Sequence, residues 1–221
     1  MAQPTLINPS TATKAIAVQK HMLSRLLYPN PVCLLTVSAR VPLEATTTET
    51  TGEAGDGLGT WARNVMTISW LTAIDNQGHF VSSMNLNRHT WSLLQHTNTF
   101  VLNVPTLRSE ELVLSIGSCS GKVKDKFEEF AIPICKINYT KLEWEPTEDE
   151  DPPLIAIQGT VAHLLCEIED ISERDGHAIL FCRITEAYAQ ESVWDGRNFG
   201  SKDDPLLSFL GTKRFATMIP P

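Results

Sequence analysis

Two apolar stretches of this sequence carry polar side chains where a strand that serves only a core would carry aliphatic ones. The first covers residues 64–70 and reads NVMTISW, and the second covers residues 82–87 and reads SSMNLN. Strands built for packing alone favour Val, Ile and aromatic residues. Because hydroxyl and amide groups gather in both stretches, we expect the two strands to hold a polar ligand.

Arg88 and Thr90 directly follow the second stretch, at the point where a helical pattern opens. Within the first stretch the side chains alternate, so that Met66 faces one way and Thr67 and Ser69 face the other. Both features also have a purely structural explanation: an edge strand with a polar outer face, and an N-capped helix whose arginine faces water.

A third candidate segment covers residues 120–127 and reads SGKVKDKF. Ser120 and Gly121 precede a predicted helix over 122–130, whose first turn would offer backbone N–H groups to an anion. Lys122 and Lys126 are four residues apart and so share a face of that helix, where their charges oppose the helix dipole. A bound phosphate would reverse this cost. An ordinary capped and solvated helix explains the segment equally well.

The spacing of cysteines and histidines argues against several other kinds of site. Five cysteines occur, an odd number without a C-x-x-C pair, which argues against a zinc site or a disulfide framework and favours a reducing compartment. His177 follows Asp175 and Gly176 at the start of an apolar strand, where a histidine more commonly belongs to a turn than to a catalytic site. No metal-ligand spacing, Ser-His-Asp signature or paired-carboxylate motif is visible.

Charge and hydropathy limit the partners. The chain has 221 residues and a formal net charge of −8 at pH 7, which argues against nucleic acid and against an anionic membrane surface. No run approaches the ~20 apolar residues of a transmembrane helix, and no signal peptide opens the chain. The cytoplasm is the expected location. The absence of Asp and Glu before Glu44 also weakly resembles a transit peptide, and a surface helix is the simpler explanation.

The periodicity predicts a single domain over residues 1–221 that is mainly β. Strands are expected at 32–37, 62–74, 79–84, 100–104, 154–158, 160–169 and 178–188, with one more short strand within 206–218. Helices are expected from about 10 to 27 and at 88–96, 108–116 and 122–130. We expect residues 1–12 to form a loose tail, and residues 44–60 and 145–153 to form acidic loops, the first of them mobile.

The order of these elements predicts the fold class. Strands and helices do not alternate regularly, and the G-x-G-x-x-G fingerprint is absent, so a doubly wound sheet is excluded. An antiparallel β-barrel with helical insertions fits instead. In the strand at 160–169, apolar and polar residues alternate, which predicts that one of its faces is exposed to water.

In their order along the chain, these segments resemble the flavin reductase-like proteins. This FMN-binding split-barrel family includes flavoredoxins and the reductase components of two-component monooxygenases. The resemblance covers roughly residues 22–215, and it rests on an ordered set of motifs because each motif alone is loose. The motifs are residues 25–32 (RLLYPNPV), 64–70, 88–90 (RHT), 100–105 (FVLNVP), 120–121 (SG), 125–127 (DKF) and 176–177 (GH).

The resemblance implies a Greek-key split barrel, a homodimer, and FMN near the subunit interface. The implied cofactor ligands, ordered from the ring through the ribityl chain to the phosphate, are Asn64, Met66, Thr67, Ser69, Ser83, Asn85, Arg88, Thr90, Ser120 and Lys126. Guanidinium forks, lysine charges and short hydroxyl donors suit a phosphate dianion. His177 would lie over the flavin where a nicotinamide docks, and would position that ring more than move protons.

The implied activity is that of an NAD(P)H-dependent flavin reductase, which takes hydride from NADH or NADPH and passes electrons to free flavin, oxygen or a partner protein. A non-enzymatic FMN-binding electron carrier of the flavoredoxin type is the alternative. Pyridoxamine-phosphate oxidase shares FMN and the barrel, but it would need an extra basic pocket that the sequence does not show. The two acidic loops depart from the family pattern. Residues 194–197 (WDGR) fit the cofactor mouth and a plain surface turn equally.

Overall fold

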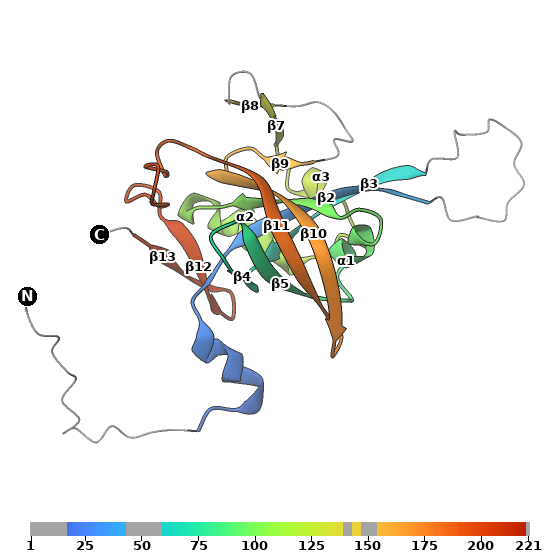
Figure 1. Ribbon diagram of the computed structural model, residues 1–221, viewed down its shortest axis with the longest axis horizontal. Helices are drawn as coiled ribbons and strands as arrows, with labels where there is room; N and C mark the ends of the chain where they lie inside the picture. The colour runs from blue at the N-terminus through green and yellow to red at the C-terminus, as the bar shows by residue number, and fades with distance from the viewer. Residues whose placement is uncertain (1–16, 43–58, 139–142, 147–153, 220–221) are drawn as a thin grey trace, which may run out of the picture.

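An open seven-stranded sheet forms the body of the molecule (Figure 1). In the computed structural model, which describes residues 17–42, 59–138, 143–146 and 154–219, its strand order is β3-β2-β6-β10-β11-β5-β4 and all pairs are antiparallel. These strands are β2 (Cys33–Val41), β3 (Thr60–Ile68), β4 (Leu71–Ala73), β5 (His79–Asn85), β6 (Thr99–Val104), β10 (Ala162–Arg174) and β11 (His177–Ala189). Strands β5 and β6 follow one another in the chain but do not pair, as expected for Greek-key connections. The predicted antiparallel split barrel is confirmed.

Two smaller sheets and several short helices complete the fold. One sheet has the order β1 (Asn30–Pro31), β12 (Leu206–Gly211), β13 (Arg214–Met218), and the other β8 (Glu143–Pro146), β7 (Ile134–Asn138), β9 (Ala156–Ile157). The helices are η1 (Lys20–Leu27), α1 (His89–Leu94), η2 (Leu107–Ser109), α2 (Glu110–Ser118) and α3 (Lys126–Glu129). The helical insertions that the sequence predicts are therefore present.

The opening of the barrel lies where the chain passes from β3 to β4. These strands are consecutive in the sequence, yet they form the two opposite edges of the sheet. Only Ser69 and Trp70 separate them, and the Trp70 carbonyl accepts a hydrogen bond of 2.9 Å from the Ser83 N–H and one of 3.1 Å from the Ser82 hydroxyl. The polar segment 64–70 therefore crosses the gap between the sheet's edges.

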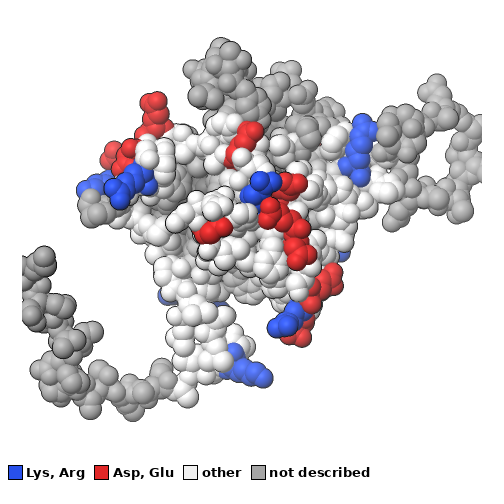
Figure 2. All heavy atoms as spheres, viewed as in Figure 1, with Lys and Arg blue, Asp and Glu red and all other residues white. Residues whose placement is uncertain are grey.

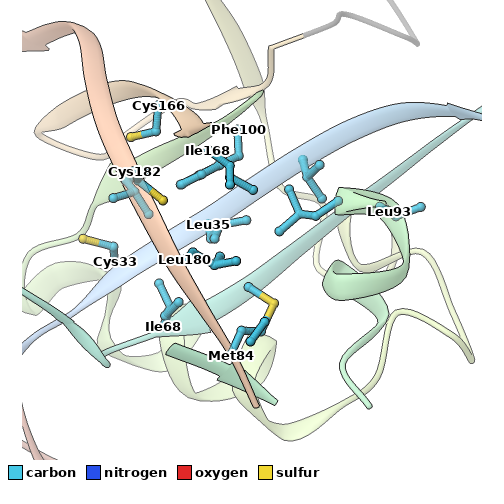
Figure 3. Close-up of a cluster of buried hydrophobic side chains, with 14 of the residues drawn as sticks. Cys33, Leu35, Ile68, Met84, Leu93, Phe100, Cys166, Ile168, Leu180 and Cys182 are labelled. Carbon is cyan, nitrogen blue, oxygen red and sulfur yellow. The ribbon is translucent and has the colours of Figure 1, made fainter. Parts of the chain in front are cut away.

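Strand β2 is buried on both faces, which explains why its first half reads as a continuous apolar run. Cys33 and Leu35 point into the barrel core (Figure 3) and Val37 belongs to the same cluster, whereas Leu34 packs on the other side in a second cluster with residues of α2 and α3. A strand covered on both faces needs apolar side chains at successive positions. The predicted buried strand at 32–37 is confirmed.

Thiols occupy part of the barrel core. Cys33, Cys166 and Cys182 are at most 5% exposed and lie among aliphatic side chains (Figure 3), and all five cysteines of the chain are free. Burial raises the pKa of Cys33 to about 12, so this thiol stays protonated at neutral pH. The buried cysteines therefore act as small apolar side chains.

The structure corrects two predicted helices. The helix predicted from about 10 to 27 is, in the described part of the chain, a 3₁₀ helix from Lys20 to Leu27 that buries none of its side chains; residues 1–16 lie outside that part. The helix predicted at 122–130 is only α3, because the Asp125 carboxylate accepts a hydrogen bond of 2.7 Å from the Phe127 N–H and caps a start four residues later. Lys122 and Lys126 therefore share no helix face.

Three strand predictions also need correction. The predicted strand at 62–74 is interrupted at the barrel opening, and residues 206–218 form a hairpin of two strands, not one. The strand at 160–169 is buried on both faces near its start, because Val193 and Leu206 pack over Val161. Most of the acidic loop at 44–60, part of that at 145–153, and the tail at 1–12 lie outside the described residues.

Candidate functional site

A cavity of about 640 Å³, called here the large cavity, lies at the barrel opening. It is bounded by the end of β3, the end of β5, the start of β11, the helix α2 and the hairpin β12–β13. The residues predicted to bind a ligand that line it are Met66, Thr67, Ser69, Ser83, Asn85, Arg88 and His177. Its volume falls within the range of roughly 300–1,000 Å³ that is usual for small-molecule sites.

A second cavity of about 380 Å³, the small cavity, adjoins the first between β3, α1 and the loop after α2. The remaining predicted residues, Asn64, Thr90, Ser120 and Lys126, line it. Met66, Thr67, Asn87, Arg88 and Gly117 line both cavities. Because they share a wall, one elongated ligand can occupy both. The structure thus brings together all the site residues that the sequence predicts.

Lys126 is the most constrained of these residues. It is 4% exposed, and its ammonium donates hydrogen bonds of 3.0 Å to the Val65 carbonyl and 2.9 Å to the Ile116 carbonyl. An ammonium carries three N–H donors, so one remains for a ligand in the small cavity. Burial lowers the pKa of Lys126, the nearby Arg88 charge lowers it further, and Cys119 acts in the opposite direction. Lys126 therefore ties β3 to α2 and also places a cation at the cavity wall.

Asn64 and the loop after α2 shape the small cavity. The Asn64 amide donates a hydrogen bond of 2.8 Å to the Thr90 hydroxyl, and both side chains are buried. Gly121 lies so close that an added Cβ would approach Asn64 Cγ and His89 Cδ2 to 2.8 Å. Only glycine fits at this position without displacing its neighbours. The backbone of the loop can therefore approach a ligand closely.

Several predicted hydroxyl and amide groups also serve the protein itself. The Thr67 hydroxyl donates 2.8 Å to the Val113 carbonyl and anchors α2 to β3. The Asn85 side chain accepts a hydrogen bond of 2.8 Å from the Asn87 N–H and stabilises the turn after β5. The Ser120 hydroxyl accepts one of 3.2 Å from the Lys122 N–H. Each oxygen keeps a lone pair, so these contacts position the groups at the cavity walls without consuming them.

Arg88 stands at the junction of the two cavities. It precedes α1 with extended backbone geometry, its side chain is exposed, and it lines both cavities. Among the described residues it takes part in no ion pair. Its charge is therefore available to an anion at the point where the cavities meet.

His177 lies at the mouth of the large cavity. It begins β11 opposite Asn85, and its ring centroid is 5.8 Å from that of Trp70. The preceding turn is made by Asp175 and Gly176, with φ angles of 50° and 75°, and His177 Nδ1 lies 3.2 Å from the Asp175 carbonyl oxygen. His177 is thus both a turn residue and a cavity residue.

Sequence reasoning missed several residues of the large cavity. They are Tyr28, Val32, Ile68, Trp70, Met84, Asn87, Val113, Leu114, Gly117, Phe209, Lys213 and Phe215. Trp70 and Asn87 adjoin predicted residues and could have been added from the strand pattern. No local pattern marks the residues of the β12–β13 hairpin, because distant packing brings it to the cavity. Residues 194–197 line neither cavity; Asp195 accepts hydrogen bonds from the backbone N–H groups of Arg197 and Asn198 in a surface turn.

Comparison with known proteins identifies the family. The model of the flavin reductase like domain matches residues 24–209, which is most of the chain. The chain belongs to the flavin reductase-like family. This agrees with the motif order in the sequence and with the split barrel.

Individual relatives of this flavin reductase-like protein are distant. The uncharacterized protein YddH of Escherichia coli is 24% identical over 160 residues, which is 70% of this chain and 78% of YddH. Flavoredoxin from Methanosarcina acetivorans has a TM-score of 0.65 at 18% identity, covering 95% of this chain and 94% of its own. The NADH:FAD oxidoreductase SgcE6 of Streptomyces globisporus has a TM-score of 0.61 at 16% identity, covering 95% and 100%. These two structures share the fold of the present chain.

Two further features of the flavin reductase-like chain concern the residues that the structure describes. None of the helices in these parts of the chain has both the length and the apolar character needed to span a membrane. No group of three or more His, Cys, Asp or Glu side chains in the same parts is arranged to hold a metal ion.

Proposed function

We propose that this protein binds FMN across the two cavities and acts as an NAD(P)H-dependent flavin reductase. The observation that carries the proposal is the pair of adjoining cavities, one large and partly aromatic, the other small and lined by cations and hydroxyls. A flavin mononucleotide has the same division, with a flat ring at one end and a phosphate at the other. Although the chain has a net charge of −8, Arg88 and Lys126 converge on the small cavity, where their two positive charges suit an anion.

In this proposal the small cavity holds the phosphate. Arg88 and Lys126 supply charge, and Thr90 and Ser120 supply hydroxyl groups. Charge-assisted hydrogen bonds of this kind are about twice as strong as those between neutral groups. The open loop backbone at Gly121 adds N–H groups that can approach the phosphate closely.

The ring then occupies the large cavity between the ends of β3 and β5. Met66, Thr67 and Ser69 line one wall, and Ser83 and Asn85 line the other; Asn64 lies beyond Met66 in the small cavity. When bound, the flavin supplies the hydride chemistry through its N5 atom. The protein positions the ring, limits the access of water, and places His177 and Trp70 where a nicotinamide would stack.

The proposal includes a homodimer in a reducing compartment such as the cytoplasm. Leu23, Leu26 and Leu27 of η1 are 51%, 69% and 81% exposed. This exposed apolar face supports a second subunit that covers it in the dimer. Five free thiols support a reducing location.

A flavin-binding electron carrier is the second candidate, supported by the likeness to flavoredoxin. It would share the FMN site and lack productive nicotinamide binding. The reductase is favoured because His177 and Trp70 leave an open, partly aromatic wall at the cavity mouth, and because SgcE6, with the same fold, has been crystallised with NAD and FAD fragments.

The visible spectrum of the purified protein tests the proposal. FMN is added first, and NADH or NADPH is then added without oxygen. We expect a perturbed flavin band that bleaches with one of the nucleotides. A band that bleaches only with dithionite would favour the carrier, and the absence of bound flavin would reject both.

A further inference from the structure

Five rings form a continuous arc along one side of the large cavity. The ring centroids of Phe215 and Phe209 are 5.8 Å apart, and those of Phe209 and Tyr28 are 5.6 Å apart. The Tyr28 hydroxyl accepts a hydrogen bond of 3.3 Å from the Trp70 indole N–H, and the Trp70 ring lies 5.8 Å from that of His177. All five residues line the large cavity and none lines the small one. The arc therefore belongs to the part of the site that the phosphate does not reach.

A tight turn between β12 and β13 adds one cation to this arc. Thr212 and Lys213 connect the strands with φ angles of 50° and 59°, so both adopt a left-handed backbone that non-glycine residues avoid. Two-residue hairpin turns of this kind usually contain Asn-Gly. Asn or Gly would relieve the strain at Thr212 and Lys213, and strained backbone of this type occurs preferentially at functional positions.

The turn is held firmly against the cavity. A Cβ added to Gly211 would lie 3.3 Å from Tyr28 Cε2 and 3.4 Å from Arg25 Nε, so the hairpin packs closely on the segment before β1. Lys213 lines the large cavity, and within the described residues it has no carboxylate partner. The strained turn therefore places the Lys213 ammonium, which has no carboxylate partner among the described residues, beside the rings of the arc.

We propose that the arc and Lys213 form a subsite for a flat aromatic carboxylate, which binds in the large cavity beside the flavin. This inference rests on the proposed function in placing the flavin there. The arc offers ring faces and edges for stacking with a planar ligand. Lys213 offers a single positive charge to a carboxylate at the edge of that ligand. One cation matches one negative charge.

The nicotinamide ring of a dinucleotide would stack on His177 and Trp70 in alternation with this ligand, but its diphosphate does not match Lys213. Its diphosphate is best held by guanidinium forks or by several backbone N–H groups at a helix N-terminus. The other described cation that lines the large cavity is Arg88, which also lines the small cavity and is assigned to the phosphate of FMN. Lys213 alone remains for the second ligand.

Ligand titrations of the FMN-loaded protein test the subsite. Benzoate and benzamide have the same ring and differ in charge, and each is followed by the shift of the flavin absorption band. We expect benzoate to bind the wild type roughly 2- to 5-fold more tightly than benzamide, the range of an ion pair at an exposed cation such as Lys213. Lys213→Gln should remove this preference, Lys213→Arg should retain it, and Lys202→Gln, at an exposed lysine that lines neither cavity, should leave it unchanged.

The turn provides an independent readout. Lys213→Gly should raise the melting temperature by roughly 2–4 °C, because glycine adopts a positive φ without strain, while benzoate binding falls as it does in Lys213→Gln. If Lys213 had only a structural role, Lys213→Gly would change the melting temperature without weakening benzoate binding.

Three outcomes overturn the inference. Equal affinities for benzoate and benzamide in FMN-loaded wild type reject the subsite and leave the proposed function intact. A Lys213→Gln variant with unchanged benzoate binding but a raised KM for NADH or NADPH assigns the cation to the dinucleotide instead. Failure of the protein to bind FMN rejects the proposed function and the subsite with it.

Discussion

The outer surface of β10 and β11 and the walls of the two cavities use charged side chains in opposite ways. On the strand surface, Arg183 contacts Glu169 at 3.0 Å and Glu167 at 3.4 Å, and at the start of the neighbouring strand β5, His79 lies 2.6 Å from Asp75. Figure 2 shows basic and acidic side chains next to each other over these strands. Arg183 therefore already has two counter-ions within the chain.

The cavity walls lack this pairing. Among the described residues, neither Arg88, Lys126 nor Lys213 takes part in an ion pair, although acidic residues outnumber basic ones in the chain. Exposed ion pairs contribute at most about 1 kcal/mol to stability, so the paired surface adds little beyond solubility. The unpaired cations are more informative, because their charges remain available to a ligand.

Lys126→Met should show the largest effect, because this residue belongs to the cavity and to the fold at once. Removing the ammonium leaves the buried Val65 and Ile116 carbonyls without their donor. We expect the free energy of unfolding to fall by roughly 2–5 kcal/mol, since each unsatisfied buried group costs about 1–3 kcal/mol. FMN affinity should fall as well. Urea denaturation and flavin titration measure the two effects.

Lys124→Met is the matched control for this variant. Lys124 is two residues away, half-exposed and paired with Glu129. Its loss should change the free energy of unfolding by less than about 1 kcal/mol and leave FMN binding unaltered. Equal losses of stability in the two variants would contradict the difference between paired and cavity cations.

Arg88→Gln and Arg183→Gln compare one arginine from each region directly. Arg88→Gln should weaken FMN binding by about 1–3 kcal/mol, the scale of a charge-assisted hydrogen bond, with little change in unfolding. Arg183→Gln should do the reverse, lowering stability by less than about 1 kcal/mol and leaving FMN affinity intact. Fluorescence quenching of FMN gives both dissociation constants. Unchanged affinity in Arg88→Gln would remove Arg88 from the flavin site.

Gly121→Ala tests how tightly the small cavity is built. The new methyl group would displace Asn64, whose amide donates to Thr90, so we expect a loss of about 1–2 kcal/mol in stability from overpacking. Gly117→Ala is the control, because its Cβ would meet Thr67 Oγ1 at an ordinary 3.5 Å and alanine favours a helix. Thermal unfolding of the apo-proteins compares them. A loss of stability in Gly117→Ala without a loss in Gly121→Ala would contradict this prediction.

The smallest expected effect concerns His89, which lines the small cavity. Burial lowers the pKa of His89, and the charges of Lys122 and Lys126 lower it further. The folded apo-protein therefore resists protonating His89, so this residue makes stability decrease as pH falls from its usual pKa of 6.5 through the lower folded value. A phosphate in the small cavity would offset the repulsion. We expect FMN to raise the pKa of His89 in an NMR titration; an unchanged pKa would place the phosphate elsewhere.

Although its helices are short, local sequence patterns predicted much of the structure of this molecule. The apolar run at 32–37 and the polar alternation at 64–70 depend on which faces of a strand are covered, and periodicity records this directly. All the predicted ligand residues accordingly line the two cavities. Their proposed roles as FMN ligands await the experiments above.

Local patterns failed where a neighbouring group competed for the same backbone. The predicted helix at 122–130 begins at Lys126 because the Asp125 carboxylate accepts from the Phe127 N–H. This shift places Lys126 in the interior and leaves Lys122 exposed. Helical spacing alone treated the two lysines as equivalent.

The sequence by itself determined the family, the mainly β architecture and the polar strands that border the cavities. These properties reside in short segments and in the order of motifs, so they need no knowledge of packing. Only the tertiary structure decided that Tyr28, near one end of the chain, and Phe209 and Lys213, near the other, meet Trp70 around one cavity. Contacts between segments so distant in sequence depend on how the hairpin packs against the barrel opening, and no local periodicity carries that information.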